Sequence, residues 1–112
     1  MTPLHYQSLA EIAQRLRVGE LTARALAEHI LARAAALAER TNAFITLMPE
    51  AALAAADRAA AARAEGILLG QLHGVPVNVK DMFDIAGVPP TAGMPSRIDH
   101  RAATNATLID QL

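Results

Sequence analysis

Apolar side chains recur at helical spacing through most of the first 65 residues. The first such stretch follows Ser8, which forms a capping-box pattern with Glu11, and it stops at Gly19, a residue suited to a helix end. Its apolar stripe consists of Leu9, Ile12, Ala13 and Leu16. This pattern predicts a short helix between Ser8 and Gly19.

A second amphipathic stretch starts after Thr22, which suits the N-cap position, and runs to about Arg40. The positions expected to be buried are Leu26, Ile30, Ala34 and Leu37. Together, the two stretches predict a small helical hairpin over about residues 8–40.

The character of the chain changes at "NAFITLM", residues 42–48, where β-branched and aromatic residues predict a short strand. Pro49 suits the first turn of a third helix, which we expect to continue to Glu65 and to end at Gly66. This helix is rich in alanine, which favours helix but buries little surface.

Glycine and proline become frequent after Gly66, as is typical of functional loops. Within this region, Val75, Val77 and Val79 alternate with polar positions and predict a strand. We therefore expect a strand–helix–strand unit with its loop over about 42–103, followed by the start of a helix at 104–112 capped by Thr104 or Asn105. The predicted fold class is α/β.

Composition narrows the functional classes. The 112 residues suffice for one domain, and a net charge of −1 gives no electrostatic reason to expect direct binding to nucleic acid or to an anionic membrane. The chain has no cysteine, which excludes thiolate chemistry and fits a cytoplasmic protein. The sequence shows neither a signal-peptide pattern nor an apolar run long enough to span a bilayer.

Lys80 is the first candidate for a catalytic residue, because it ends the predicted strand 75–79. Open α/β sheets place their sites at the carboxyl ends of strands. A lysine that loses hydration there becomes a competent general base. The Lys80-Asp81 pair also fits an alternative, since a charged pair at a strand end is typical of a solvated junction.

The longer stretch from Gly70 to Leu112 resembles the amidase signature family. It is similar to the family's G-x-L-x-G-[VI]-P-x-x-[VI]-K-D block, followed by a D-x-A-G-x-P-T-T-A-G loop, and the helices before it resemble the family's N-terminal region. The resemblance implies that this chain corresponds to the N-terminal part of a larger mixed-sheet domain.

That resemblance implies hydrolysis of a carboxamide C–N bond by a Ser–cis-Ser–Lys triad, in which Lys80 is the lysine. It implies a small-molecule amide substrate, no metal and no organic cofactor. The loop of Thr91, Ala92 and Gly93 would line the site, and we expect Asp81 to position neighbouring groups rather than to transfer protons.

Three departures from the family pattern bear on this interpretation. Pro90 stands where the family often has the first threonine of a pair, and Asn105 stands where aspartate is common. Neither serine of the triad has a counterpart, because Ser8 belongs to a capping box and Ser96 to a polar loop. We therefore expect the isolated chain to be catalytically inert.

Other interpretations remain open. An A-subunit-like component of a glutamine amidotransferase, which acts in tRNA-dependent amidation, has the same signature, and a non-enzymatic helical interaction fragment would keep only the helices. A homodimer or a partner subunit is compatible with each. Four histidines, His5, His29, His73 and His100, lack the spacing of a metal site and indicate scattered surface positions.

Overall fold

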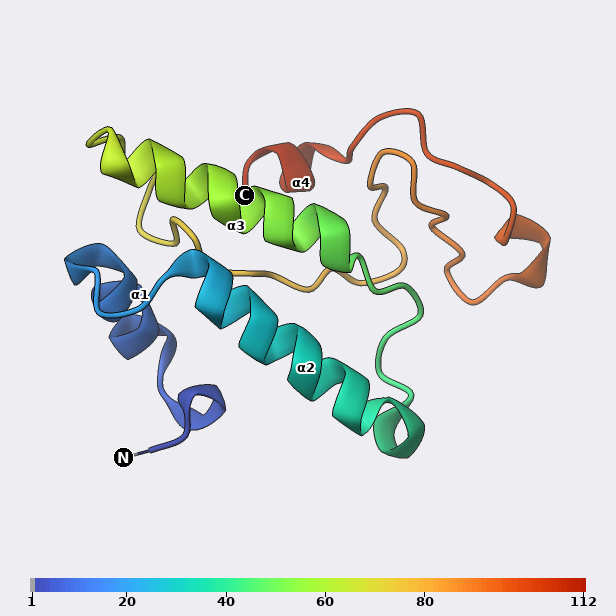
Figure 1. Cartoon of the computed structure of the whole chain (residues 1–112). Helices are drawn as coiled ribbons and strands as arrows, with labels where there is room; N and C mark the ends of the chain where they lie inside the picture. The colour runs from blue at the N-terminus through green and yellow to red at the C-terminus, as the bar shows by residue number, and fades with distance from the viewer. Residues whose placement is uncertain (1) are drawn as a thin grey trace. The chain divides into compact units, whose positions relative to one another are not determined.

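The computed structural model describes residues 2–112. The chain divides into two compact units, a first that extends to Pro76 and a second from Val77 to Leu112. Figure 1 labels the helices of both units along the chain. Each unit is described by itself below.

The first long helix, α1, spans Leu9–Val18 and has the predicted ends. The Ser8 hydroxyl accepts a hydrogen bond from the backbone N–H of Glu11, and the Glu11 carboxylate accepts one from the backbone N–H of Ser8. Gly19 closes the helix in the left-handed conformation, with φ of 84°. The capping box and the glycine stop are therefore confirmed.

Two longer helices, α2 (Ala23–Thr41) and α3 (Pro49–Ala64), complete the helical part of the first unit and run in opposite directions (Figure 1). Thr22 caps α2 by accepting from the backbone N–H of Ala25, as expected. The end of α3 is a Schellman turn, in which Ile67 N–H donates to the Ala62 carbonyl and Gly66 N–H to the Arg63 carbonyl. The predicted helix positions therefore agree with the structure to within one residue.

The core of the first unit is small and lies where α1, α2 and α3 meet. Leu26 of α2 is its most buried large side chain, 2% exposed. Alanines fill much of the remainder, which permits the close approach of α2 and α3 expected from the alanine-rich sequence. The buried members are Leu16, Ala23, Leu26, Ala27 and Ala56.

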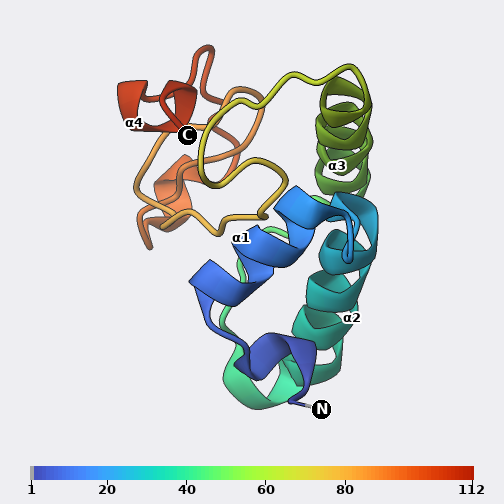
Figure 2. The same ribbon diagram turned by 90° about the vertical axis from the view of Figure 1, so that its left-hand side faces the viewer.

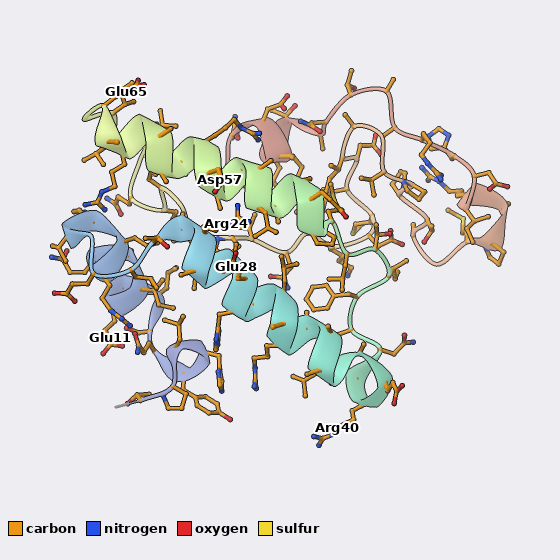
Figure 3. All side chains as sticks on the ribbon, in the orientation of Figure 1. Glu11, Arg24, Glu28, Arg40, Asp57 and Glu65 are labelled. Atoms are coloured by element: carbon orange, nitrogen blue, oxygen red, sulfur yellow. The ribbon has the colours of Figure 1, made fainter. Side chains whose placement is uncertain are left out.

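Polar contacts join the same helices at their surface. The Arg24 guanidinium of α2 lies 2.7 Å from the Asp57 carboxylate of α3 and 2.9 Å from Glu28 one turn further along α2. Figure 3 shows these three side chains together between the two helices. All three are largely exposed, so the apolar core contributes more to this packing than the ion pairs do.

The predicted α/β class and the first strands of a mixed sheet are wrong for this chain, because residues 2–112 contain no strand. Both expected strands, 42–48 and 75–79, are irregular backbone. A strand exists only through hydrogen bonds to a neighbouring strand, and the described residues supply no such neighbour. The alternation at Val75, Val77 and Val79 is thus a strand pattern without partners, and Val77 is 54% exposed.

The segment after α3 is held instead by side-chain contacts. His73 bridges it to the helix, because its Nε2 lies 2.7 Å from the Ala59 carbonyl and its Nδ1 accepts from the backbone N–H of Leu69 at 2.9 Å. Gly74, at φ of 84°, then passes close to the start of α2. An added Cβ there would meet the Cβ of Ala23 at 3.1 Å.

The second unit is mostly loop, with a 3-10 turn η2 (Pro95–Arg97) and a single short helical turn α4 (Thr107–Asp110). The expected cap at Thr104 or Asn105 is wrong, because α4 begins after Ala106, which forms no side-chain cap. None of the helices within residues 2–112 is long and apolar enough to cross a membrane.

Candidate active-site loop

Lys80 lies on the second unit as an exposed side chain just before a turn. Its carbonyl accepts from the backbone N–H of Phe83 at 3.1 Å, which starts the loop that follows. It is also the only lysine of the chain. The expectation that Lys80 ends a buried strand is wrong, because residues 75–79 form no strand and Lys80 is exposed.

Asp81 closes the loop that begins at Lys80. Its carboxylate accepts two hydrogen bonds from Thr91, one from the backbone N–H at 3.3 Å and a short one from the hydroxyl. The Asp81 carbonyl also accepts from the backbone N–H of Ala92 at 3.2 Å. The Lys80-Asp81 pair and the Thr91-Ala92-Gly93 loop, predicted separately, are therefore in direct contact through Asp81 and Thr91.

The backbone N–H groups of the loop opposite Asp81 have three different acceptors: that of Thr91 donates to the carboxylate, that of Ala92 to the Asp81 carbonyl, and that of Gly93 to the Thr91 hydroxyl. Ala92 and Gly93 both have positive φ, 48° and 74°. The Thr91 hydroxyl bond, supported by backbone bonds from Thr91, Ala92 and Gly93, holds the pKa of Asp81 below its ordinary value. Asp81 thus acts as an ionised anchor, and the Thr91 hydroxyl is engaged as its donor.

A second set of hydrogen bonds connects segment 84–88 to the segment just before α4. Gly87 N–H donates to the Ala102 carbonyl at 2.9 Å, and Ala106 N–H donates to the Asp84 carbonyl at 2.9 Å. Asn105 accepts from the backbone N–H of Ala86 and donates to the Asp110 carboxylate, each at 2.8 Å. Segment 84–88 is therefore joined to segment 102–106.

Pro90 and Asn105, the two departures from the family pattern, have different structural consequences. Pro90 is buried within this loop. Asn105 is not the neutral helix cap that we expected, because it uses its carbonyl oxygen and its amide N–H on two different partners. An aspartate at this position would keep the first contact and lose the second.

The serines of the chain have the local roles that the sequence indicated. The Ser8 hydroxyl donates to the Glu11 carboxylate at 2.7 Å, and Ser96 is an exposed residue of η2. Within the described residues, no serine hydroxyl forms a hydrogen bond with Lys80.

The histidines are not scattered as expected, since two of them pair across 24 positions and a third bridges two segments. His5 and His29 are in hydrogen-bonding contact, and His73 joins Ala59 to Leu69. The spacing of the histidines along the chain did not indicate either the His5–His29 contact or the bridge formed by His73. No cluster of three or more metal-ligating side chains occurs among residues 2–112.

A cavity of about 250 Å³ lies in the first unit between α1, α3 and the segment around Gly70 and His73. Its walls are mainly apolar, and Arg17 and Arg63 are its charged residues. None of the predicted site residues lines it.

Comparison with known proteins places these features in a family. The sequence model of the amidase family matches residues 25–112. Over all 112 residues, the chain is 44% identical to the A subunit of glutamyl-tRNA(Gln) amidotransferase from Chloroflexus aggregans, of which it covers 23%. Over 96 residues, 86% of the chain, it is 38% identical to an amidase of Pseudomonas putida, of which it covers 20%.

A solved structure also resembles this chain. It is described as part of a vestigial protein complex that reveals the evolutionary origins of an s-triazine catabolic enzyme. It matches 93% of this chain with a TM-score of 0.88 and 33% identity. The match covers 23% of that solved chain, so this chain spans about a quarter of the length of its relatives. The chain belongs to the amidase signature family.

Proposed function

We propose that this chain contributes the lysine of a Ser–cis-Ser–Lys triad that hydrolyses a carboxamide C–N bond. In this mechanism, Lys80 accepts the proton that a bridging serine relays from the nucleophilic serine. The nucleophile then attacks the amide carbonyl to form an acyl-enzyme, and the amine leaves with a proton. Water releases the acid in the second half of the reaction.

The observation that carries the proposal is the contact between the lysine-bearing turn and the Thr91-Ala92-Gly93 loop through Asp81. Asp81 directly follows Lys80, so a bond from Asp81 to Thr91 restrains the backbone that carries the lysine. Precise placement of a base matters because proton transfer requires hydrogen-bonding distance to its partner. The loop is proposed to line the substrate site, with Asp81 as its positioning residue.

Burial of Lys80 is the second requirement, and the described residues leave it exposed. We propose that the desolvation comes from protein outside residues 77–112, together with the two serines. On this proposal, the 112 residues by themselves are inert.

The A subunit of a glutamine amidotransferase is the second candidate. It is favoured by the 44% identity to the Chloroflexus aggregans protein over all 112 residues, against 38% over 96 residues for the Pseudomonas putida amidase. Both candidates cleave an amide C–N bond, and they differ in the fate of the ammonia. A partner subunit that co-purifies with the chain and increases ammonia release from glutamine supports the amidotransferase. Hydrolysis of small amides without a partner supports the amidase.

The test uses a chimera in which residues 1–112 replace the aligned part of the Pseudomonas putida amidase. If Lys80 is the base, Lys80→Ala lowers kcat by a factor of about 10²–10⁴. Lys80→Arg is equally inactive, because a guanidinium does not give up its proton near neutral pH. Ammonia release from small carboxamides measures both.

Arg101→Ala is the matched control, because it removes an exposed positive charge from the same unit. It is expected to leave kcat within about twofold, as surface substitutions usually do. Retention of full activity by Lys80→Ala would exclude the proposed role. Amide hydrolysis by the isolated 112 residues, abolished by Lys80→Ala, would contradict the expected inertness.

A further inference from the structure

The first unit contains a histidine pair that the proposed reaction does not use. His5 lies in η1, a 3-10 turn over Leu4–Tyr6, and His29 lies on α2. Figure 2 shows this N-terminal turn, in dark blue, beside α2. His5 Nδ1 and His29 Nε2 are 3.1 Å apart, and this hydrogen bond joins the turn to the helix.

The orientation of the two rings identifies the contact as a hydrogen bond. The rings are nearly parallel, at 13°, and their centroids are 5.3 Å apart, farther than the two nitrogens. The nitrogens therefore face each other across the gap. One must carry a proton and the other a lone pair, because a neutral imidazole has one donor and one acceptor.

Protonation of both rings removes this contact. A doubly charged pair has two donors facing each other and no acceptor. Two positive charges at this separation also repel each other. The hydrogen bond can form when both rings are neutral and when one ring is charged, but not when both are charged.

The surroundings oppose the second charge. Arg33, on the same helix, lies over the Tyr6 ring at 5.9 Å, and Tyr6 packs beside His5 at 4.4 Å between centroids. Desolvation of His5, followed by the charges of Arg33 and His29, lowers the pKa of His5. From α1, Arg15 binds Gln7, the residue after the turn, and lies 4.0 Å from the Glu20 carboxylate.

We propose that His5 and His29 form a proton-controlled latch that holds the N-terminal turn on α2 and opens when both rings are charged. The latch secures Leu4, which packs against the buried core of the first unit. Since His5 resists protonation while docked, docking is complete above the ordinary pKa of histidine. It is lost as the pH falls through the lowered value.

NMR titration of the full 112-residue chain tests the latch. In the latch, His5 gains its proton below the ordinary pKa of histidine, and its ring protons report that step. Contacts between Leu4 and the buried core of the first unit, followed by methyl NOEs, disappear over the same pH range. His100, an exposed residue of the second unit that is not part of the pair, serves as the internal reference.

Variants separate the latch from general unfolding. His29→Gln keeps a hydrogen-bonding side chain but removes one titrating site, so the Leu4 contacts persist through the acidic range in which the wild type loses them. His100→Gln leaves the pH dependence of the Leu4 contacts unchanged. Persistence of the Leu4 contacts after both rings are protonated overturns the proposal, as does loss of the Leu4 contacts at the same pH in wild type and His29→Gln.

Discussion

The Asp81 carboxylate and the Thr91 hydroxyl, ten positions apart, share a hydrogen bond that closes the loop after Lys80. The bond joins the two pieces of sequence on which the family resemblance depends. Its removal tests whether the loop owes its conformation to this one contact.

Asp81→Asn is expected to loosen the Thr91-Ala92-Gly93 loop, because a neutral amide is a weaker acceptor than a carboxylate for the Thr91 hydroxyl and backbone N–H. Amide hydrogen exchange at Thr91 and Gly93 is expected to be faster in the variant. Asp84→Asn is the control, since Asp84 contacts segment 102–106 through its backbone carbonyl. Equal exchange rates in Asp81→Asn and wild type would show that the loop does not depend on this carboxylate.

The same contact predicts a pH dependence. The pKa of Asp81 is lowered in the folded loop, so its stabilisation is present above the ordinary aspartate value of about 3.9. It is lost as the pH falls through the lower folded value. The Thr91 amide resonance is expected to shift over that acidic range in wild type. A similar shift in Asp81→Asn would assign the transition to another group.

Asn105→Asp is expected to weaken the link between Ala86 and α4, although aspartate is common at this position in the family. The new carboxylate would face Asp110 in place of an amide donor, at a cost of about 1 kcal/mol. The double variant Asn105→Asp/Asp110→Asn restores one donor and one acceptor and should recover most of the loss. A double-mutant cycle measured by chemical denaturation gives the coupling energy. Additive effects of the two substitutions would mean that the side chains do not interact.

Gly74→Ala and Gly66→Ala separate backbone strain from packing. Both positions have positive φ, 84° and 79°, so both variants incur about 1–2 kcal/mol of left-handed strain. Only at Gly74 does the new Cβ meet another residue, Ala23 at 3.1 Å, which adds about 1–3 kcal/mol of overpacking. The difference between their unfolding free energies measures the packing cost. Equal losses would mean that the Gly74 segment moves away from α2 freely.

Leu26→Ala is expected to destabilise the first unit by about 2–5 kcal/mol, because Leu26 is its most buried large side chain. In a core otherwise made largely of alanine, few neighbours can move to fill the cavity. Leu9→Ala, at a position 53% exposed, is the control and should cost less than about 0.5 kcal/mol. Thermal unfolding followed by circular dichroism compares them. A small effect at Leu26 would indicate that α2 is not packed as described.

Local sequence determined the helices of this protein. Ser8 and Glu11 satisfy each other within one turn, Thr22 caps its own helix, and Gly66 ends α3 through bonds to the turn before it. Each of these helix caps and stops involves residues only three to five positions apart, so the local sequence is enough to determine where the helix begins or ends. The family was also readable from the sequence, because the Gly70–Leu112 pattern is contiguous.

Only the tertiary structure decided which distant residues meet. The alternation in Val75–Val79 predicted a strand, but a strand requires a paired neighbour, and the described residues provide none. The contacts of Asp81 with Thr91, Asn105 with Ala86 and His5 with His29 depend on turns that bring separate segments together. A helix completes its backbone hydrogen bonds within its own sequence, whereas strands and side-chain sites depend on partners that local sequence does not name.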